Sequence, residues 1–215
     1  IGWEFDASLL PNAATIRQDP AMLTKTDYTA QANAMTFPSK NLIGGAWVDA
    51  QSGQTFETKN PADGAVLSTL PLSEAADVDA AVASAREAFE SGIWSGLHPS
   101  ERKAILVKLA DLIETHTEEL AVMEAIAAGK PIAACLEIDI PETANCIRWH
   151  AEAQDKLYDQ IAPSAPNAVG MIVREPIGVV GAVLPWNFPL MMMAWKIGPA
   201  LATGTSVLVQ PADPP

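Results

Sequence analysis

Three polar residues after two apolar segments are the first candidates for chemistry in this sequence. Asn187 stands in a Pro-Trp-Asn-Phe-Pro run after the apolar segment 179–184, and Gln210 and Asp213 follow the apolar segment 207–209. An amide donates and accepts hydrogen bonds, and a carboxylate accepts them from hydroxyl groups. All three side chains can therefore orient a polar ligand. For Asn187 a second interpretation is equally open, because its side chain can instead cap the following helix.

The surrounding pattern predicts a β-α-β unit that brings these residues together. The runs 179–184 and 207–209 have strand length, and residues 189–201 have a helical pattern. Pro189 stands in the first turn of that helix and Gly204 follows its end, as is common at helix termini. Open parallel α/β sheets bind ligands outside the carboxyl ends of their strands. We therefore expect a ligand site at that edge.

The sequence predicts an α/β fold with four regions. Residues 1–40 are polar and irregular and predict an N-terminal extension, whereas 41–157 hold short strands followed by helices. A Pro- and Ala-rich, then β-like segment predicts a hairpin arm over 158–176. The truncated β-α-β unit occupies 177–215.

Local signals place the elements of the second region. A Gly-Gly turn predicts a hairpin over 42–48, and two further strands are expected near 54–59 and 65–71. Four residues mark predicted helix starts, with the last helix covering 140–157: Ser73, Pro99, Thr117 and Pro141. We expect Gly129 to end the third helix. In the fourth helix, we expect Ile147 and Trp149 to lie in the core.

Composition excludes several classes of function. The sequence has 26 acidic and 13 basic residues and a formal net charge of -13. An acidic surface repels phosphate backbones and anionic lipids, so neither nucleic acid nor a membrane surface is an expected partner. The uncharged run 177–195 is long enough to span a bilayer, but its central Pro185, Asn187 and Pro189 argue against a spanning helix.

The two cysteines, Cys135 and Cys146, have no metal-ligand spacing. We interpret them as buried free thiols, which favours a reducing, cytoplasmic compartment, and no metal site is expected. His116 and His150 stand alone in the sequence and are interpreted as structural. The N-terminus lacks the basic and apolar regions of a signal peptide, and it also lacks an initiator Met.

Several motifs together resemble the aldehyde dehydrogenase superfamily over residues 41–213. They are the run 185–189, the segment Trp-Lys-Ile-Gly-Pro-Ala-Leu-Ala at 195–202, the Gly-Gly-Ala-Trp of the first hairpin, Gly-Lys-Pro at 129–131 and Arg-Glu-Pro-Ile-Gly-Val at 174–179. Residues 139–141 and 146–153 are most similar to dehydrogenases of ω-amino aldehydes, such as γ-glutamyl-γ-aminobutyraldehyde dehydrogenase. The resemblance implies the N-terminal part of that fold: a Rossmann-like parallel sheet with helices and a β-hairpin oligomerisation arm, in a homodimer or tetramer.

The resemblance also implies a reaction, oxidation of an aldehyde to a carboxylic acid with NAD(P)⁺. A cysteine thiolate attacks the aldehyde to give a thiohemiacetal, hydride passes to the nicotinamide, and a glutamate-activated water hydrolyses the thioester. Asn187 matches the oxyanion-hole asparagine, and Lys196 matches a lysine near the catalytic centre, although a solvated lysine explains it equally well. The positions that match the coenzyme site are Leu184, Pro185, Trp186, Gln210 and Asp213.

Departures from the family pattern affect the coenzyme site. Gln210 replaces a lysine that hydrogen-bonds the adenosine ribose, and Asp213 stands where a glutamate often accepts ribose hydroxyls and disfavours a 2′-phosphate. The resemblance therefore favours NAD over NADP. Ala127 stands where many family members have an aspartate. In some relatives that aspartate contacts a cation, and Ala127 lacks this contact.

The family's nucleophile and general base match no residue of this sequence, since both cysteines precede the Asn187 motif. We expect an aldehyde dehydrogenase of which this is the N-terminal part; the alternative is a truncated, non-catalytic chain that acts as a binding or assembly partner. A generic dinucleotide-binding module is disfavoured because no G-x-G-x-x-G is present. A chain of residues 1–215 alone would leave an apolar sheet edge open, so it is predicted to be poorly soluble and inactive.

Overall fold

The computed structural model describes residues 24–212 and divides between Ala34 and Met35 into two compact units. In the first unit the described part is helix α1 (Lys25–Ala34). Its start is stabilised by reciprocal hydrogen bonds, because the Asp27 amide donates to Thr24 Oγ1 at 3.3 Å and the Thr24 amide donates to Asp27 Oδ2 at 2.9 Å. The prediction that all of residues 1–40 are irregular is therefore wrong for this helix. Residues 1–23 of the predicted extension lie outside the described part of the chain.

Two antiparallel hairpins begin the second unit. Strands β1 (Asn41–Ile43) and β2 (Ala46–Val48) pair across Gly44 and Gly45, whose φ angles of 60° and 78° suit glycine alone without strain. Strands β3 (Thr55–Lys59) and β4 (Val66–Pro71) form the second hairpin. All four strands lie where the sequence predicts them.

A series of helices follows these hairpins. The elements are α2 (Ala75–Glu90), α3 (Pro99–Thr115), α4 (Thr117–Ala128), α5 (Ile132–Ala134), the π-helix η3 (Cys135–Asp139), α6 (Ile140–Ala153) and the 3₁₀ turn η4 (Gln154–Lys156). The predicted starts at Pro99 and Thr117 are confirmed, and Gly129 ends α4 with a φ of 68°. Neither α5 nor the π-helix was expected from the sequence.

The predicted cap at Ser73 is wrong by one residue. The N-cap of α2 is Glu74, whose amide donates to Asp77 Oδ2 at 2.9 Å. Asp77 Oδ1 also accepts a hydrogen bond of 2.9 Å from the Gln51 amide, so this buried carboxylate joins the helix to the preceding loop. Ser73 instead accepts a hydrogen bond of 2.8 Å from Asn41. The sequence rule favours a serine, but the carboxylate of Asp77 completes the reciprocal pair one position later.

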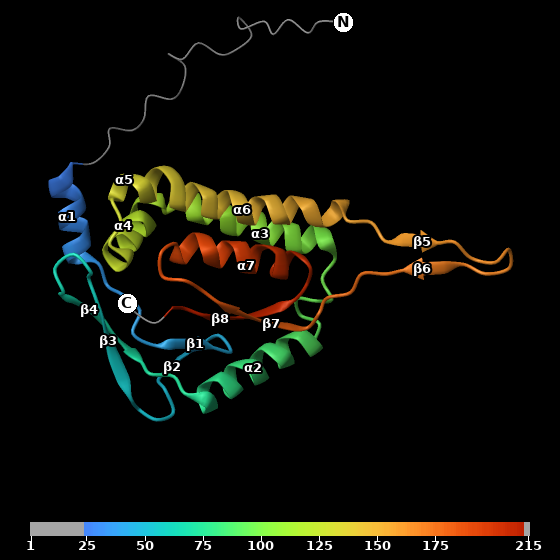
Figure 1. The fold of residues 1–215 in the computed structure, drawn as a ribbon, viewed down its shortest axis with the longest axis horizontal. Coiled ribbons are helices and arrows are strands. Elements are labelled where there is room, and N and C mark those ends of the chain that lie inside the picture. Colours follow the sequence, from blue (N-terminus) through green and yellow to red (C-terminus); the bar gives the residue numbers. More distant parts are fainter. Residues whose placement is uncertain (1–23, 213–215) are drawn as a thin grey trace, which may run out of the picture. The chain divides into compact units, whose positions relative to one another are not determined.

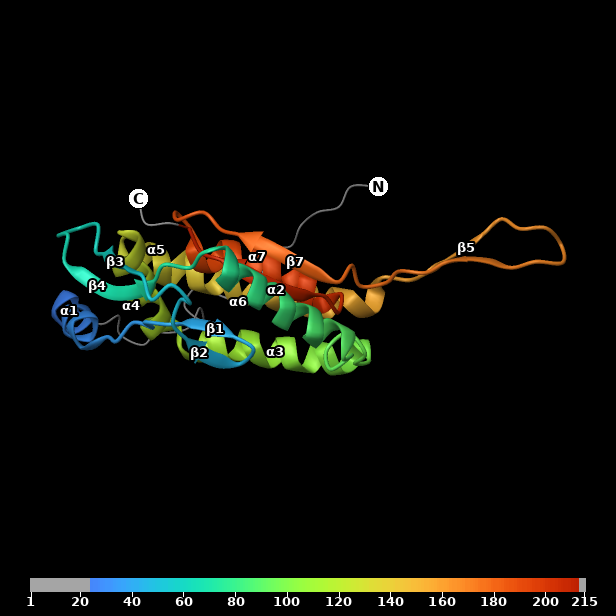
Figure 2. The ribbon, with the colours of Figure 1, turned by 90° about the horizontal axis from the view of Figure 1, so that it is seen from below.

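The β-α-β unit consists of β7 (Val179–Val183), α7 (Pro189–Ala202) and β8 (Ser206–Gln210), and the two strands are parallel, as predicted. Helix α7 lies on one side of this sheet and α2 on the other, with α3 and α6 packed behind α7 (Figures 1 and 2). None of the helices in the described part of the chain is long and apolar enough to cross a membrane.

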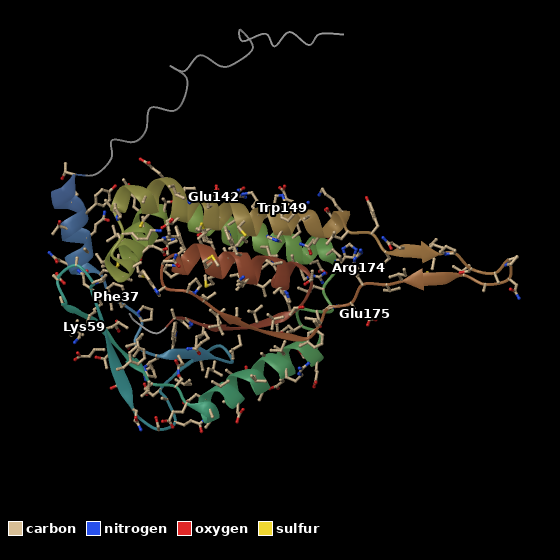
Figure 3. All side chains as sticks on the ribbon, viewed as in Figure 1. Phe37, Lys59, Glu142, Trp149, Arg174 and Glu175 are labelled. Atoms are coloured by element: carbon tan, nitrogen blue, oxygen red, sulfur yellow. The ribbon has the colours of Figure 1, made fainter. Side chains whose placement is uncertain are left out.

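The main core lies among α3, α6 and α7. Ile147 is fully buried there, as predicted, but Trp149 is 62% exposed, and the prediction that it belongs to the core is wrong. Figure 3 shows Trp149 on α6. Because it stands two residues after Ile147 on the helix, it points away from the face that Ile147 presents to the core. Gly198 of α7 lets helices α6 and α7 approach closely, because a Cβ at this position would lie 3.1 Å from Nδ1 of His150 on α6.

A two-stranded arm extends between α6 and the β-α-β unit (Figure 1). Strands β5 (Gln160–Ala162) and β6 (Gly170–Ile172) pair antiparallel, and Ile161 and Met171 face each other across the pair. Arg174, labelled in Figure 3, closes the base of the arm: its amide donates to Asp159 Oδ1 and its guanidinium to the Tyr158 carbonyl, each at 3.0 Å. The hairpin lies within the predicted range 158–176.

Candidate functional site

The carboxyl ends of the two parallel strands meet, as the sequence predicts. The Leu184 amide donates a hydrogen bond of 3.0 Å to the Gln210 carbonyl and extends the strand pairing by one step. Leu184 is buried, whereas Pro185 and Trp186 beyond it are exposed. Gln210 is exposed and donates to the Pro211 carbonyl at 3.3 Å. Four of the five predicted coenzyme residues thus lie at one edge of the sheet, and Asp213 lies outside the described residues.

Asn187 lies in the bend between this edge and helix α7. The interpretation of Asn187 as a helix cap is wrong, because the N-cap residue of α7 is Phe188 and no side chain caps the helix there. Asn187 is exposed, and within residues 24–212 its side-chain amide has no hydrogen-bond partner. Its N–H donors are therefore available to a ligand at the positive end of the α7 dipole.

Lys196 lies farther along α7. It is exposed, and its ammonium has no ion pair in the described part of the chain. It stands at the seventh position after the helix start at Pro189, which corresponds to about 10 Å along the helix axis. Lys196 thus belongs to helix α7, whereas Asn187 lies in the bend before its N-cap residue Phe188.

Polar side chains hold the carboxyl end of α7. Trp94 Nε1 donates to the Leu201 carbonyl at 3.0 Å, and Arg102 Nε donates to the Ala202 carbonyl at 3.2 Å. The last carbonyl groups of a helix have no partner within it, so these bonds satisfy them. Arg102 is buried and also donates to the Leu97 carbonyl, which ties α7 to the loop before α3.

The amino end of α7 contacts a cluster of two buried carboxyl groups and a partly buried lysine, which we call the Glu124 cluster: Glu124, Lys130 and Asp139. The Lys130 ammonium lies 3.7 Å from the centre of the Phe188 ring and forms an ion pair with Asp139. Burial, and then the nearby Asp139 charge, raise the pKa of Glu124 to about 7, against the opposing effects of a hydrogen bond from the Leu190 backbone and of Lys130. Sequence reasoning missed this cluster. The available signal was a single charged residue, Glu124, inside the apolar pattern of residues 120–128.

Comparison with known proteins decides the family. A model of the aldehyde dehydrogenase family matches residues 47–214. The chain belongs to this family. An aminoacetaldehyde dehydrogenase of Pseudomonas aeruginosa is 54% identical over 191 residues, which are 89% of this chain and 38% of the relative. The predicted resemblance to the superfamily is confirmed, together with the similarity to dehydrogenases of amino aldehydes.

Solved structures of aldehyde dehydrogenases share the fold. A γ-glutamyl-γ-aminobutyraldehyde dehydrogenase from Burkholderia cenocepacia J2315 superposes with a TM-score of 0.85 at 46% identity, covering 87% of this chain and 38% of that one. An indole-3-acetaldehyde dehydrogenase in complex with NAD⁺ gives the same TM-score, identity and coverage. The predicted fold class is confirmed, and the chain spans less than half the length of these relatives.

Neither cysteine of this aldehyde dehydrogenase chain is an activated nucleophile. Cys135 is fully buried, and burial followed by the Asp139 charge raises the pKa of its thiol to about 11. Burial, with Glu142, also raises the pKa of Cys146. Both thiols are free and protonated at neutral pH, whereas a nucleophile must be a thiolate. This agrees with the expectation that the reacting cysteine is neither of these residues.

Two further features lie apart from the site. An open depression of about 390 Å³ is lined by Phe37, Trp47, Met123 and the neighbouring residues 36–40, and it contains none of the predicted site residues. Phe37 is labelled in Figure 3. Within residues 24–212 there is no group of three or more His, Cys, Asp or Glu that would hold a metal ion.

Proposed function

We propose that the whole protein oxidises an aldehyde to a carboxylic acid with NAD(P)⁺, and that this chain contributes the oxyanion donor and one side of the coenzyme site. The observation that carries the proposal is the position of Asn187, whose amide is exposed and unpaired within the described residues at the carboxyl edge of the parallel strands. The family membership fits this placement. The alternative of a non-catalytic assembly chain has no observation in its favour.

Asn187 acts on the oxygen of the aldehyde. When a nucleophile adds to the carbonyl carbon, negative charge moves onto that oxygen, and a fixed side-chain N–H stabilises it. The start of α7 supports the same charge, because the first amides of a helix carry partial positive charge. Lys196 adds a positive charge farther along α7 and is the second proposed catalytic residue.

The edge beside Asn187 fits a nicotinamide coenzyme. Pro185 and the 57% exposed Trp186 offer an apolar surface next to the polar Asn187 and Gln210. A nicotinamide has a flat ring and a polar carboxamide, so it matches both kinds of surface. When bound, the coenzyme supplies the hydride acceptor. We propose that Leu184, Pro185, Trp186, Gln210 and Asp213 contact it, with NAD⁺ preferred over NADP⁺.

The substrate class follows from the relatives named above. One acts on aminoacetaldehyde and another on γ-glutamyl-γ-aminobutyraldehyde, so we propose an aldehyde that carries an amino or amide group on its chain. The acidic net charge of -13 favours a cationic amino aldehyde during diffusion to the site. We propose the cytoplasm as the location, and a homodimer or tetramer assembled through the β5–β6 arm.

The test is NADH formation by the purified whole protein. Aminoacetaldehyde, an uncharged aldehyde of the same length and benzaldehyde are supplied with NAD⁺, and NADH absorbance is followed. The proposal expects aldehyde-dependent NADH formation with the highest kcat/KM for the amino aldehyde. Absence of NADH with all three substrates would refute the enzyme activity, and preference for benzaldehyde would refute the substrate class.

A further inference from the structure

The Glu124 cluster contacts Phe188, the residue that follows Asn187. Its three members come from α4, from the loop after α4 and from the π-helix η3. Glu124 and Asp139 are 5% and 1% exposed. Ionisable groups this deeply buried are costly unless they are paired, so an intact cluster requires a structural or functional reason.

Lys130 connects the cluster to the residue after Asn187. Its ammonium is fixed from one side by the buried Asp139 and lies 3.7 Å from the centre of the Phe188 ring on the other. A cation over an aromatic face is attractive, and the attraction grows when water is excluded. The Lys130 side chain is 17% exposed, so little water competes. The ring of Phe188 is thereby held in one place.

Glu124 holds the same turn at a second point. The Leu190 backbone lowers the pKa of the Glu124 carboxyl, so this buried carboxyl lies near one of the first amides of α7, which no helical carbonyl satisfies. The Phe188 carbonyl accepts a hydrogen bond of 2.8 Å from Met192, which starts the helical pattern. Asn187 has no side-chain hydrogen bond of its own in the described part of the chain, so only its neighbours fix its position.

We propose that Lys130 and Glu124 are positioning residues for Asn187, which they orient by anchoring Phe188 and Leu190 without touching substrate. The inference rests on the proposed function, since Asn187 must be the oxyanion donor. Orientation of such a donor matters because a displacement of about 1 Å reduces the rate of an enzyme by as much as about 100-fold. The cluster therefore contributes to the rate of the chemical step and not to coenzyme binding.

The test compares Lys130→Met with Lys130→Arg and the wild type in the whole protein. Methionine removes the charge at similar length, whereas arginine keeps a cation over the ring and a donor for Asp139. We expect Lys130→Met to lower kcat about 10- to 100-fold, with the KM for NAD⁺ within about twofold of wild type. Lys130→Arg should restore most of the loss. Amide hydrogen exchange of peptides covering 186–192 should be faster in Lys130→Met than in wild type.

Lys103→Met is the matched control. It removes an ion pair of 3.1 Å with Asp155 that lies between α3 and η4, far along the chain from the Asn187 turn. Partly exposed pairs of this kind contribute about 0–1 kcal/mol, so kcat and the exchange of 186–192 should remain unchanged. If Lys130→Met does not fold, Phe188→Leu takes its place, because it removes the ring and leaves the Lys130–Asp139 pair intact.

The outcomes separate the inference from the proposed function. A wild type that forms no NADH from any aldehyde removes the proposed function and the inference with it. An active wild type with an unchanged kcat or unchanged exchange at 186–192 in the variant overturns the inference alone. An equal loss of kcat, coenzyme affinity and exchange protection over the whole protein also overturns it, because that result describes general destabilisation.

Discussion

The Leu184 amide donates to the Gln210 carbonyl at 3.0 Å and joins the carboxyl ends of two parallel strands that are separated by a whole helix in the sequence. This bond places the Pro-Trp-Asn-Phe-Pro turn beside the end of β8. The groups at this edge are exposed: Trp186, Asn187 and Gln210. The edge has the composition of a coenzyme site, apolar with a few polar groups.

Asp213 is predicted to control the choice of coenzyme. If its carboxylate meets the coenzyme ribose as we propose, it accepts hydrogen bonds from the ribose hydroxyls and repels a 2′-phosphate, so Asp213→Ser should raise kcat/KM with NADP⁺ about tenfold and lower it with NAD⁺. The measurement is the ratio of the two kcat/KM values for the whole protein. Asp79→Ser, at an exposed position of α2, is the control and should leave the ratio unchanged. An unaltered ratio in Asp213→Ser would show that this carboxylate does not meet the ribose.

Glu124 is predicted to make stability depend on pH. Its pKa is about 7 in the folded protein against an ordinary value of 4.5, because burial and Asp139 disfavour its charge. Below the lower value the group is neutral in both states, and as pH rises towards 7 the unfolded state loses its proton first. The folded state therefore loses stability over this window, by an amount on the order of 3 kcal/mol.

Glu124→Gln removes the titration and keeps a side chain of nearly the same size, with an oxygen that can still accept a hydrogen bond. The melting temperature of the variant should exceed that of wild type at about pH 8 and match it at about pH 5, as measured by scanning calorimetry. The nearby Cys135 thiol does not interfere, because burial raises its pKa to about 11, above this window. A constant difference between variant and wild type at both pH values would contradict the assignment.

How much the sequence predicts depends on the range of the interactions involved. The hairpin at Gly44 and Gly45, the end of α4 at Gly129 and the β-α-β unit follow from backbone preferences and periodicity within a few residues. The Asn187 motif was likewise found from its own residues and their resemblance to a family.

The missed features all depend on contacts between distant residues. The Glu124 cluster brings together three segments and the start of α7, and no local pattern pairs Lys130 with Phe188. Trp149 shares a helix with the core residue Ile147, and its outward direction follows from where α3 and α7 pack. The start of α2 was displaced by one residue because Asp77 completes the cap at Glu74.

The β5–β6 arm is predicted to hold subunits together. Ile161 and Met171 are paired across the arm and are 78% and 69% exposed, so they offer apolar surface to a second copy of the protein. Ile161→Asp should lower the oligomeric mass of the whole protein in light scattering. Asn167→Asp, an exposed change at the tip of the arm, should not. An unchanged mass in Ile161→Asp would mean that the arm is not the interface.

Residues 1–215 expressed alone are predicted to aggregate and to form no NADH. Ile177 and Val183 of the β-α-β unit are 83% and 75% exposed, and β7–β8 is a two-stranded sheet with unpaired edges in the described part of the chain. Size-exclusion chromatography with light scattering checks this. A soluble monomer with a sharp cooperative melt would contradict the prediction.

Asn187→Ala in the whole protein tests the central claim most directly. Because the amide is exposed and unpaired within the described residues, its removal should change the free energy of unfolding by less than about 0.5 kcal/mol. Loss of an oxyanion donor should lower kcat about 100- to 1000-fold, with the KM for NAD⁺ little changed. Asn167→Ala, at the arm tip, should leave kcat as in wild type. A kcat for Asn187→Ala within a few fold of wild type would contradict the placement of the oxyanion site at this turn.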